Sequence, residues 1–562
     1  MKTLTGVAAS NGTAIAPAWI HSAGNIALPN EPVSDPDAEV EGLDAAIDEV
    51  VGELEAKASS AGGELGEILE AQVEMARDPE LAELARTAVR EHKTPAAKAV
   101  MDAGESYAVV LEGSDSEYMA ARADDVRDVC RRIARRLIGA PEPDIKELSE
   151  PVVIIAGEVP PADVADLDRN LVVAIATEQG SKTSHTAIVA RALGIPAVVA
   201  VGGLLDAVDA GTTVAVDGVK GVVHIDPEET LRNEFEIAAK DVERRRSDLE
   251  SRLAEGPTAT SDGHRIEVAA NVGSTAELRA ALDAGAEAVG LLRTELLFLE
   301  RRKPPGEDEQ LEMILEMAEL LDGKRMIVRT FDFGADKPIP FIDVEGGPNP
   351  ALGVRGIRLA KHHPELLETQ LRAIVGAAGR GARLGVMAPM VASTEEAEWF
   401  VQQVRDAGGD DVELEVGVMV EVPSAVLVAS DLAAHLDFFS IGTNDLTQYL
   451  HAADRQQGAL AALQDPFSPA VLRAVEAVSR DASDRAWVGV CGEAAGDPAW
   501  ALVAIGLGVR ELSMGAGSVL EARVTVGEHS LEDCRAVAKE AAAASSAADA
   551  RTIAERLLTA KK

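Results

Sequence analysis

Cysteine is nearly absent from this chain, whose 562 residues include only Cys130, Cys491 and Cys534. Their odd number and wide spacing exclude a disulfide framework and a clustered set of zinc-binding thiolates. Long apolar runs are also missing: no uncharged apolar stretch reaches the roughly 18 residues that a membrane span needs, and the N-terminal residues lack the apolar core of a signal peptide. We therefore expect a cytoplasmic protein without membrane insertion.

Positive charge is scarce as well. The chain carries 53 Lys and Arg residues against 95 Asp and Glu residues, which gives a formal net charge of −42 at pH 7. This excess of acid repels the phosphates of nucleic acids and of anionic membranes, so we expect neither as a partner. The acidic, lysine-poor composition resembles the halophilic composition of proteins from salt-accumulating cells, and an ordinary acidic cytosolic enzyme is the alternative. The two interpretations differ in whether activity is lost at low ionic strength.

A chain of this length holds several domains, and its patterns predict an α/β multidomain protein. We expect a β/α domain formed by residues 1–20 and 140–230, interrupted by a helical subdomain at 21–139. A strongly charged linker helix follows at 231–255, and residues 256–562 form the last domain.

Two kinds of periodicity support these boundaries. Apolar residues at three- and four-residue spacing predict helices over residues 40–58, 65–77, 79–91, 94–111 and 115–137. Short apolar runs predict buried strands over residues 152–156, 171–176, 214–216 and 221–225, with which the small residues of 1–20 could pair.

From about residue 265 onward, eight apolar runs alternate with helical stretches. The runs are 266–271, 288–292, 326–329, 384–390, 416–420, 437–441, 487–490 and 511–514. Strands alternating with helices in this number predict a (β/α)8 TIM barrel. The remaining tail, from residue 531, is expected to form one or two helices.

Reactive residues follow the ends of these runs. In such barrels the site lies at the C-terminal ends of the strands, so these side chains are expected to converge. The set comprises Arg293, Arg329, Arg355, Glu421, Asn444, Asp445, Arg455 and Cys491. Guanidinium groups suit phosphate and carboxylate oxygens, and the carboxylates of Glu421 and Asp445 suit Mg²⁺. For the charged residues, the alternative to a ligand site is a network of structural ion pairs. For Cys491, the two alternatives are a buried small residue and a proton donor.

His185 lies in the hydroxyl-rich segment 180–191, where a short helix is expected to begin at Thr183 or Ser184. Free backbone N–H groups and the helix dipole favour an anion at such a place, so a phosphate carried on His185 would be stabilised there. A capping or surface histidine is the alternative.

Several of these segments together resemble enzyme I of the bacterial sugar phosphotransferase system, a member of the PEP-utilising enzymes. The resemblance rests on residues 180–199, 290–295, 329–332, 419–423, 437–449 and 491–493. It implies that the β/α domain is a phosphohistidine domain in which His185 is phosphorylated and steadied by Thr183. It further implies that phosphoenolpyruvate is bound by Arg293, Arg329, Asn444 and Arg455, that Mg²⁺ is held by Glu421 and Asp445, and that Cys491 protonates the enolate.

The same resemblance implies the partners. Residues 70–81 and 122–129 are similar to the subdomain by which this family docks its small HPr-like phosphocarrier protein, although a solvated helix face is the alternative for charged segments. A homodimer through the barrel domain is also implied. Asn11 stands where the family commonly has proline, and we interpret it as a tolerated turn residue.

Two other functions are compatible with a phosphohistidine domain joined to a barrel. Pyruvate phosphate dikinase and phosphoenolpyruvate synthase carry a large nucleotide-binding domain, for which this chain has neither room nor a P-loop motif. A catalytically silent regulator would need no proton donor such as Cys491.

Overall fold

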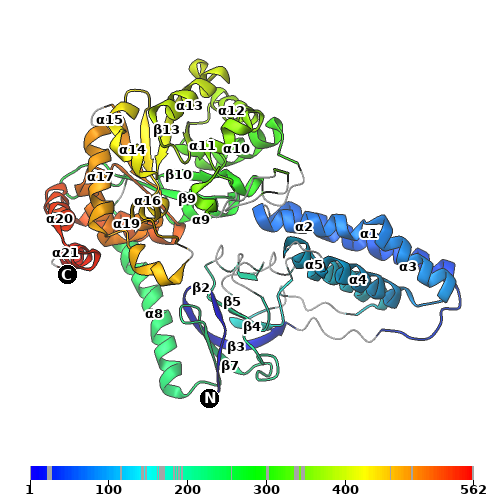
Figure 1. Ribbon diagram of the computed structural model, residues 1–562. Helices are drawn as coiled ribbons and strands as arrows, with labels where there is room; N and C mark the ends of the chain where they lie inside the picture. The colour runs from blue at the N-terminus through cyan, green and yellow to red at the C-terminus, as the bar shows by residue number, and fades with distance from the viewer. Residues whose placement is uncertain are drawn as a thin grey trace. The chain divides into compact units, whose positions relative to one another are not determined.

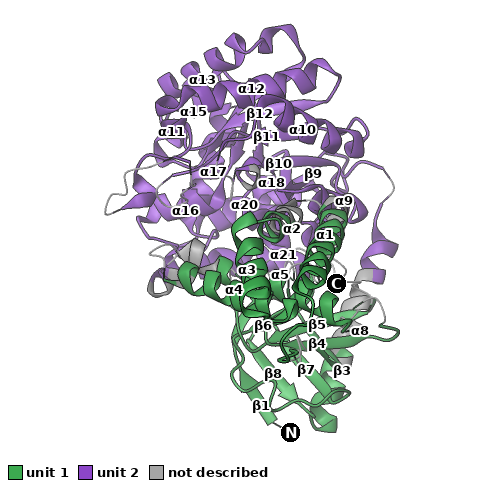
Figure 2. Cartoon of the chain, turned by 90° about the vertical axis from the view of Figure 1, so that its right-hand side faces the viewer, with its two compact units in different colours: residues 1–245 green, residues 246–562 purple. Residues whose placement is uncertain are grey.

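Two compact units make up the chain, Met1–Arg245 and Arg246–Lys562, coloured green and purple in Figure 2. The computed structural model describes residues 2–21, 28–61, 63–113, 117–140, 145, 148–160, 163, 171–180, 184, 186–187, 190, 194–254, 256–298, 303–334, 339, 341–342, 349–455, 457–482 and 485–559.

The first unit contains an eight-stranded mixed sheet with the strand order β1-β8-β7-β3-β4-β5-β6-β2. Its strands are β1 (Lys2–Thr5), β2 (Val7–Ser10), β3 (Thr13–His21), β4 (Val152–Ala156), β5 (Val172–Thr177), β6 (Ala197–Val199), β7 (Thr213–Asp217) and β8 (Val222–Ile225). Strands β4 and β5 consist almost wholly of buried aliphatic residues, as expected for strands covered on both faces. The expected pairing of the N-terminal residues with later strands is confirmed, because β3 lies between β7 and β4.

Five long helices are inserted between β3 and β4, and Figure 1 shows them grouped together. They are α1 (Pro36–Ala61), α2 (Gly63–Ala76), α3 (Pro79–His92), α4 (Ala96–Glu112) and α5 (Glu117–Ile138). Their apolar faces form a separate core that includes Leu43, Leu54, Val89 and Ile133. The amphipathic spacing in the sequence thus corresponds to a helical bundle with its own interior.

A buried cluster of charged groups connects this bundle to the sheet. His21 Nε2 on β3 lies 2.9 Å from Asp163 Oδ2, and Arg132 Nη2 on α5 donates to Asp163 Oδ1 at 2.7 Å. Burial raises the pKa of Asp163, but the hydrogen bonds and charges of His21 and Arg132 outweigh it and hold the pKa well below the ordinary range. The carboxylate therefore stabilises the native unit as an anion.

We expect Asp163→Asn to lower the stability of the first unit at neutral pH by about 2 kcal/mol, because the buried Arg132 loses its charged partner at 2.7 Å and keeps Asp128 at 3.1 Å. Since the native pKa is depressed, the stabilisation is present above pH ~4 and is lost as the pH falls further. Hydrogen exchange of peptides from β3 and α5 in the full chain would measure the loss. The exposed Asp206→Asn is the control. Equal protection in Asp163→Asn and wild type at neutral pH would contradict the prediction.

Helix α8 (Glu229–Arg252) is a single charged helix that contains the sequence boundary between the two units. Arg252 near its C-terminal end is fixed in the second unit by hydrogen bonds to Glu528, at 2.7 Å for each carboxylate oxygen.

The second unit is a closed barrel of eight parallel strands, which confirms the predicted (β/α)8 fold. Its strands are β9 (Glu267–Val272), β10 (Ala288–Arg293), β11 (Met326–Arg329), β12 (Leu384–Ala388), β13 (Leu414–Val420), β14 (Phe438–Ile441), β15 (Trp487–Val490) and β16 (Glu511–Met514). β9 pairs with both β10 and β16, so the sheet has no free edge.

Helices surround this barrel and follow its strands. The longer ones are α9 (Thr275–Asp283), α10 (Glu307–Leu321), α12 (Pro364–Gly379), α13 (Thr394–Asp406), α16 (Thr443–His451), α17 (Pro469–Ala482), α18 (Pro498–Gly506) and α19 (Ala516–Glu528). Two further helices, α20 (Leu531–Ala543) and α21 (Ala547–Thr559), form the tail. No described helix of either unit is long and apolar enough to cross a membrane.

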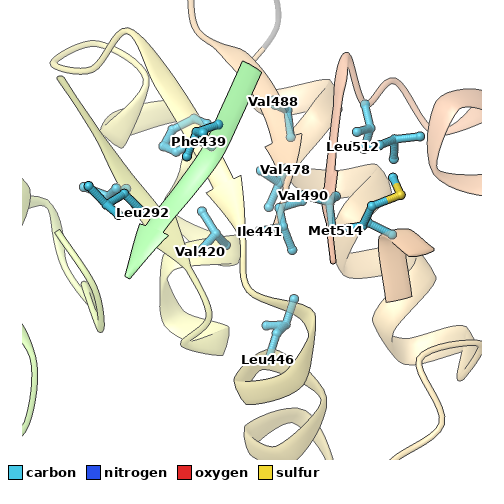
Figure 3. Close-up of a cluster of buried hydrophobic side chains, with 14 of the residues drawn as sticks. Leu292, Val420, Phe439, Ile441, Leu446, Val478, Val488, Val490, Leu512 and Met514 are labelled. Carbon is cyan, nitrogen blue, oxygen red and sulfur yellow. The ribbon is translucent and has the colours of Figure 1, made fainter. Parts of the chain in front are cut away.

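Alternation along each strand divides the barrel side chains into two sets. Val420, Ile441 and Val490 belong to the large core that the strands share with the helices (Figure 3). Met419 and Cys491, which are next to Val420 and Val490 in the sequence, belong to a smaller second cluster that also contains Phe438 of β14. This alternation decides which side chains at the strand ends face the barrel axis.

Candidate active site at the barrel mouth

A cavity of about 590 Å³ opens at the C-terminal ends of the strands. It is lined by Asn271, Leu291, Arg293, Arg329, Met419, Glu421, Gly442, Thr443, Asn444, Asp445, Thr447, Arg455, Gln464, Pro466, Cys491, Gly492, Glu493 and Ala494. The structure therefore brings together seven of the eight strand-end residues singled out in the sequence, and Arg355 does not line the cavity.

Strand geometry explains the convergence. Arg329 lies two residues after Ile327, and Glu421 two residues after Met419; Ile327 and Met419 both belong to the smaller cluster. Because residues two apart on a strand share a face, the charged side chains continue this inward-facing row to the mouth. An apolar barrel interior thus ends in a polar rim.

Arg329 is held rigidly at this rim. Its Nη2 donates to Glu295 Oε1 at 2.7 Å, and its Nη1 lies 3.7 Å from Asp332 Oδ2. Burial opposes the charge of Arg329, but Glu295 and Asp332 outweigh it and raise its pKa further. The guanidinium is therefore a permanent cation, and its buried Nε–H has no acceptor among the described residues.

Arg355 does not line the cavity, but it contacts two carboxylates of the site. It is 1% exposed, and its Nη2 and Nε donate to the two carboxylate oxygens of Asp332 at 2.7 and 3.2 Å. Its Nη1 lies 3.5 Å from Asp445 Oδ1. As placed here, Arg355 connects Asp332 to Asp445 instead of presenting its fork to the cavity.

Glu295 and Asp332 were given no role from the sequence. Asp332 is fully buried, and its backbone N–H donates to Glu295 Oε1 at 2.9 Å, the same oxygen that binds Arg329. The available signal was their position within segments 290–295 and 329–332, directly beside the two arginines. A carboxylate close in sequence to a strand-end arginine can bind its guanidinium group and fix its position.

The remaining polar groups at the mouth are more accessible. Arg293, at the end of β10, has a half-exposed side chain whose Nη2 donates to Glu277 Oε2 at 3.3 Å. Arg455 Nη1 lies 3.8 Å from Asp445 Oδ2. Asn444, in the first turn of α16, accepts from the backbone N–H of Glu493 at 3.3 Å. All three side chains line the cavity, where they can contact an anion.

Glu421 and Asp445 are the carboxylates of the cavity. Glu421 is 1% exposed, its Oε1 accepts from the backbone N–H of Met390 at 2.6 Å, and its Oε2 has no hydrogen-bond partner among the described residues. Burial and the neighbouring charge of Asp445 raise the pKa of Glu421 to about 7. A buried carboxylate oxygen without a donor, beside a second carboxylate, is a site that a cation would satisfy.

Glu421 and Asp445 could therefore hold a divalent cation, although they would supply only a few of its ligands. Within the described parts of the chain, no three carboxylate, thiol or imidazole side chains form a metal-binding group. Mg²⁺ often binds through one or two carboxylates and keeps waters or substrate oxygens as its other ligands. The pair is compatible with that kind of site.

Cys491 is a buried residue that lines the cavity. It follows β15, its backbone oxygen accepts from Asn271 Nδ2 at 2.8 Å, and its Sγ lies 3.8 Å from the carbonyl oxygen of Ile441. Burial raises the pKa of the thiol to about 12, so it stays protonated at neutral pH. The next residue must be glycine, because a Cβ on Gly492 would lie 1.8 Å from Thr443 Oγ1. This close approach brings Cys491 next to the start of α16.

His185 and Thr183 lie outside the described residues, so their predicted roles stay predictions. Their described neighbours Ala187 and Ala190 are buried with the sheet core of the first unit. Thr186 Oγ1 donates to the carbonyl oxygen of Val159 at 3.4 Å.

Comparison with known proteins covers all parts of the chain. Residues 5–122 match the N-terminal domain, residues 148–221 the mobile domain and residues 247–531 the PEP-binding domain of the PEP-utilising enzymes. A phosphoenolpyruvate-protein phosphotransferase of Streptomyces coelicolor is 44% identical over 99% of both chains. Proteins of the same name are 41% identical in Haloferax volcanii, over 91% of this chain and 90% of the relative, and 38% identical in Bacillus subtilis, over 95% of both. The chain therefore belongs to the phosphoenolpyruvate-protein phosphotransferase family of PEP-utilising enzymes.

Proposed function

We propose that this protein transfers the phosphoryl group of phosphoenolpyruvate to His185 and then to a histidine of a small HPr-like phosphocarrier protein, releasing pyruvate. In this proposal it performs the first step of sugar uptake and phosphorylation by a phosphotransferase system, in the cytoplasm. The observation that carries the proposal is the barrel-mouth cavity, which combines arginines, a carboxylate pair and a protonated thiol in a member of this family.

Phosphoenolpyruvate carries several negative charges that repel an incoming lone pair. Arg293, Arg329 and Arg455 would neutralise its phosphate and carboxylate oxygens, and the Asn444 amide would add hydrogen bonds. Since Arg329 is already fixed by Glu295 and Asp332, little reorganisation is needed when substrate binds. The phosphoryl group would thus be held in line for attack by a neutral nitrogen of His185.

Glu421 and Asp445 would hold the Mg²⁺ of this reaction. The cation would supply further charge neutralisation at the phosphoryl oxygens. The unpartnered Oε2 of Glu421 supports this assignment, because its neighbouring carboxylate raises the cost of leaving both anions uncompensated.

Cys491 is the proposed proton donor. After the P–O bond breaks and the N–P bond to His185 forms, enolpyruvate carries an electron-rich methylene carbon. The thiol transfers its proton to that carbon and gives the keto form of pyruvate, and the resulting thiolate takes a proton back from water. Its raised pKa keeps the proton on sulfur until an electron-rich carbon arrives.

The carrier protein is proposed to dock on the helical bundle α1 to α5, and the barrel domain is proposed to pair as a homodimer. Since His185 must reach first phosphoenolpyruvate and then the carrier, the proposal requires the first unit to move with respect to the barrel. α8, which crosses the boundary in the sequence, is the candidate connection.

The deciding experiment incubates the full chain with phosphate-labelled phosphoenolpyruvate and Mg²⁺ at high salt and without nucleotide. We expect acid-labile label on the wild type, none on His185→Ala, and loss of the label when a histidine-containing carrier is added. An unlabelled wild type would favour the silent regulator. Label obtained from ATP instead would favour the dikinase type of reaction.

A further inference from the structure

A second cavity, of about 390 Å³, lies at the opposite end of the barrel. It is lined by His264, Arg265, Glu267, Arg325, Arg383, Trp487, Arg510 and Glu511. Every one of these residues precedes or begins a strand, so this barrel floor cavity is built from the N-terminal strand ends. It shares no lining residue with the cavity at the mouth.

The floor concentrates positive charge in a protein that has little of it. Four of the eight lining residues are arginines, whereas the whole chain has a net charge of −42. Two of the four are compensated: Arg325 binds Glu267, Glu415 and Glu511, and Arg265 binds Glu287. Burial raises the pKa of Glu511, and the charge of Arg325 opposes that rise.

The other two arginines are not compensated. Arg383 and Arg510 are exposed, and neither side chain makes a hydrogen bond or ion pair with any residue in the described part of the chain. Their strands, β12 and β16, are four positions apart in the ring of eight, so the two arginines lie on opposite sides of the floor. Both therefore border the same cavity from opposing directions.

A third donor group lines the same cavity. Arg325 is 8% exposed, lines the cavity, and has a buried Nε–H without an acceptor among the described residues. Such a donor is costly unless an acceptor oxygen reaches it. Trp487 offers no stacking surface, because Phe438 stacks on its ring at 4.7 Å and Arg325 covers it at 4.1 Å. The chemistry of the floor favours oxyanion groups over an aromatic ring.

We propose that the barrel floor cavity binds a small molecule with two oxyanion groups, which Arg383 and Arg510 hold from opposite sides. Guanidinium forks bind carboxylates and phosphates alike, so the ligand is a dicarboxylate or a diphosphate compound. The cavity volume falls in the range of small-molecule sites. This site is independent of the proposed phosphotransfer, which takes place at the other end of the barrel.

Calorimetric titration of the full chain with succinate, and separately with inorganic pyrophosphate, tests the proposal, in the absence of Mg²⁺ and phosphoenolpyruvate. We expect at least one of the two probes to bind. Each of Arg383→Gln and Arg510→Gln weakens that binding about tenfold, and the double variant weakens it about a hundredfold. Succinate alone would identify a dicarboxylate site, and pyrophosphate alone a phosphate site.

Two controls separate the floor from other sites. Arg535→Gln removes an exposed charge of the same unit that does not line the cavity, and Arg329→Lys perturbs the mouth. Binding is expected to persist in both, and the double variant is expected to melt at the wild-type temperature because its changed side chains are exposed. The proposal is overturned if neither probe binds, if the double variant binds normally, or if Arg329→Lys abolishes binding.

Discussion

Cys491→Ala is expected to lower the rate of pyruvate formation by about 10²- to 10⁴-fold, the usual contribution of a positioned general acid. The thiol is 4% exposed at the cavity wall, and its pKa of about 12 keeps it protonated. In the proposed mechanism, a variant without this thiol releases enolpyruvate, which becomes the keto form only afterwards in solution. Transfer then loses the favourable protonation step that drives it. For the same reason, Cys491 itself should cause no loss of wild-type activity between pH 6 and 9.

The stereochemistry of protonation distinguishes this role from a structural one. With phosphoenolpyruvate labelled stereospecifically at its methylene carbon, the wild type should protonate one face and Cys491→Ala should protonate both. Cys534→Ala is the matched control, because Cys534 is equally buried in the barrel unit but does not line the cavity. A Cys491→Ala variant within twofold of the wild-type rate, with retained stereospecificity, would refute the assignment.

The second large effect is expected from Arg329→Lys, which should reduce kcat/KM for phosphoenolpyruvate by about 10²-fold or more. Lysine keeps the charge but loses the planar fork that binds Glu295 and that, in the proposed mechanism, also binds substrate oxygens. The protein should stay folded, because a cation still faces Glu295 and Asp332. Arg329→Ala, in contrast, is expected to cost about 3–5 kcal/mol of stability, since both carboxylates are buried.

Steady-state kinetics together with thermal unfolding measure these two consequences separately. Arg523→Lys is the matched control: its side chain is 12% exposed against 9% for Arg329, and it binds Thr258 and the carbonyl oxygens of Gly285 and Gly256 away from the mouth. A normal kcat/KM in Arg329→Lys would mean that Arg329 only stabilises the barrel.

Local patterns in the sequence were sufficient to predict where most helices and strands lie. The helices α1 to α5 begin and end within about four residues of the predicted ranges, because an amphipathic helix repeats its apolar positions every turn. The barrel strands were found from their apolar runs, since both of their faces are buried. β6 was missed because Ala197–Val199 is too short to show a pattern of its own.

The candidate site was only partly predictable. The rule that barrel sites form at C-terminal strand ends led to Arg293, Arg329, Glu421 and Cys491, which all line the mouth cavity. The phosphohistidine role of His185 was implied by resemblance and stays a prediction, because His185 lies outside the described residues. The sequence could not show that Arg355 is buried against Asp332, 23 residues away, because local periodicity carries no information about such pairs.

What the sequence by itself determined is the order of the elements, the closed parallel barrel and the residues available at each strand end. The tertiary structure alone decided which of those residues share a partner. Glu295 joins Arg329 and the backbone of Asp332, and Arg383 and Arg510 border one floor cavity although they are far apart in the chain. The reason is barrel closure: strand register and tilt fix which side chains meet across the axis, and both are set by all eight strands together.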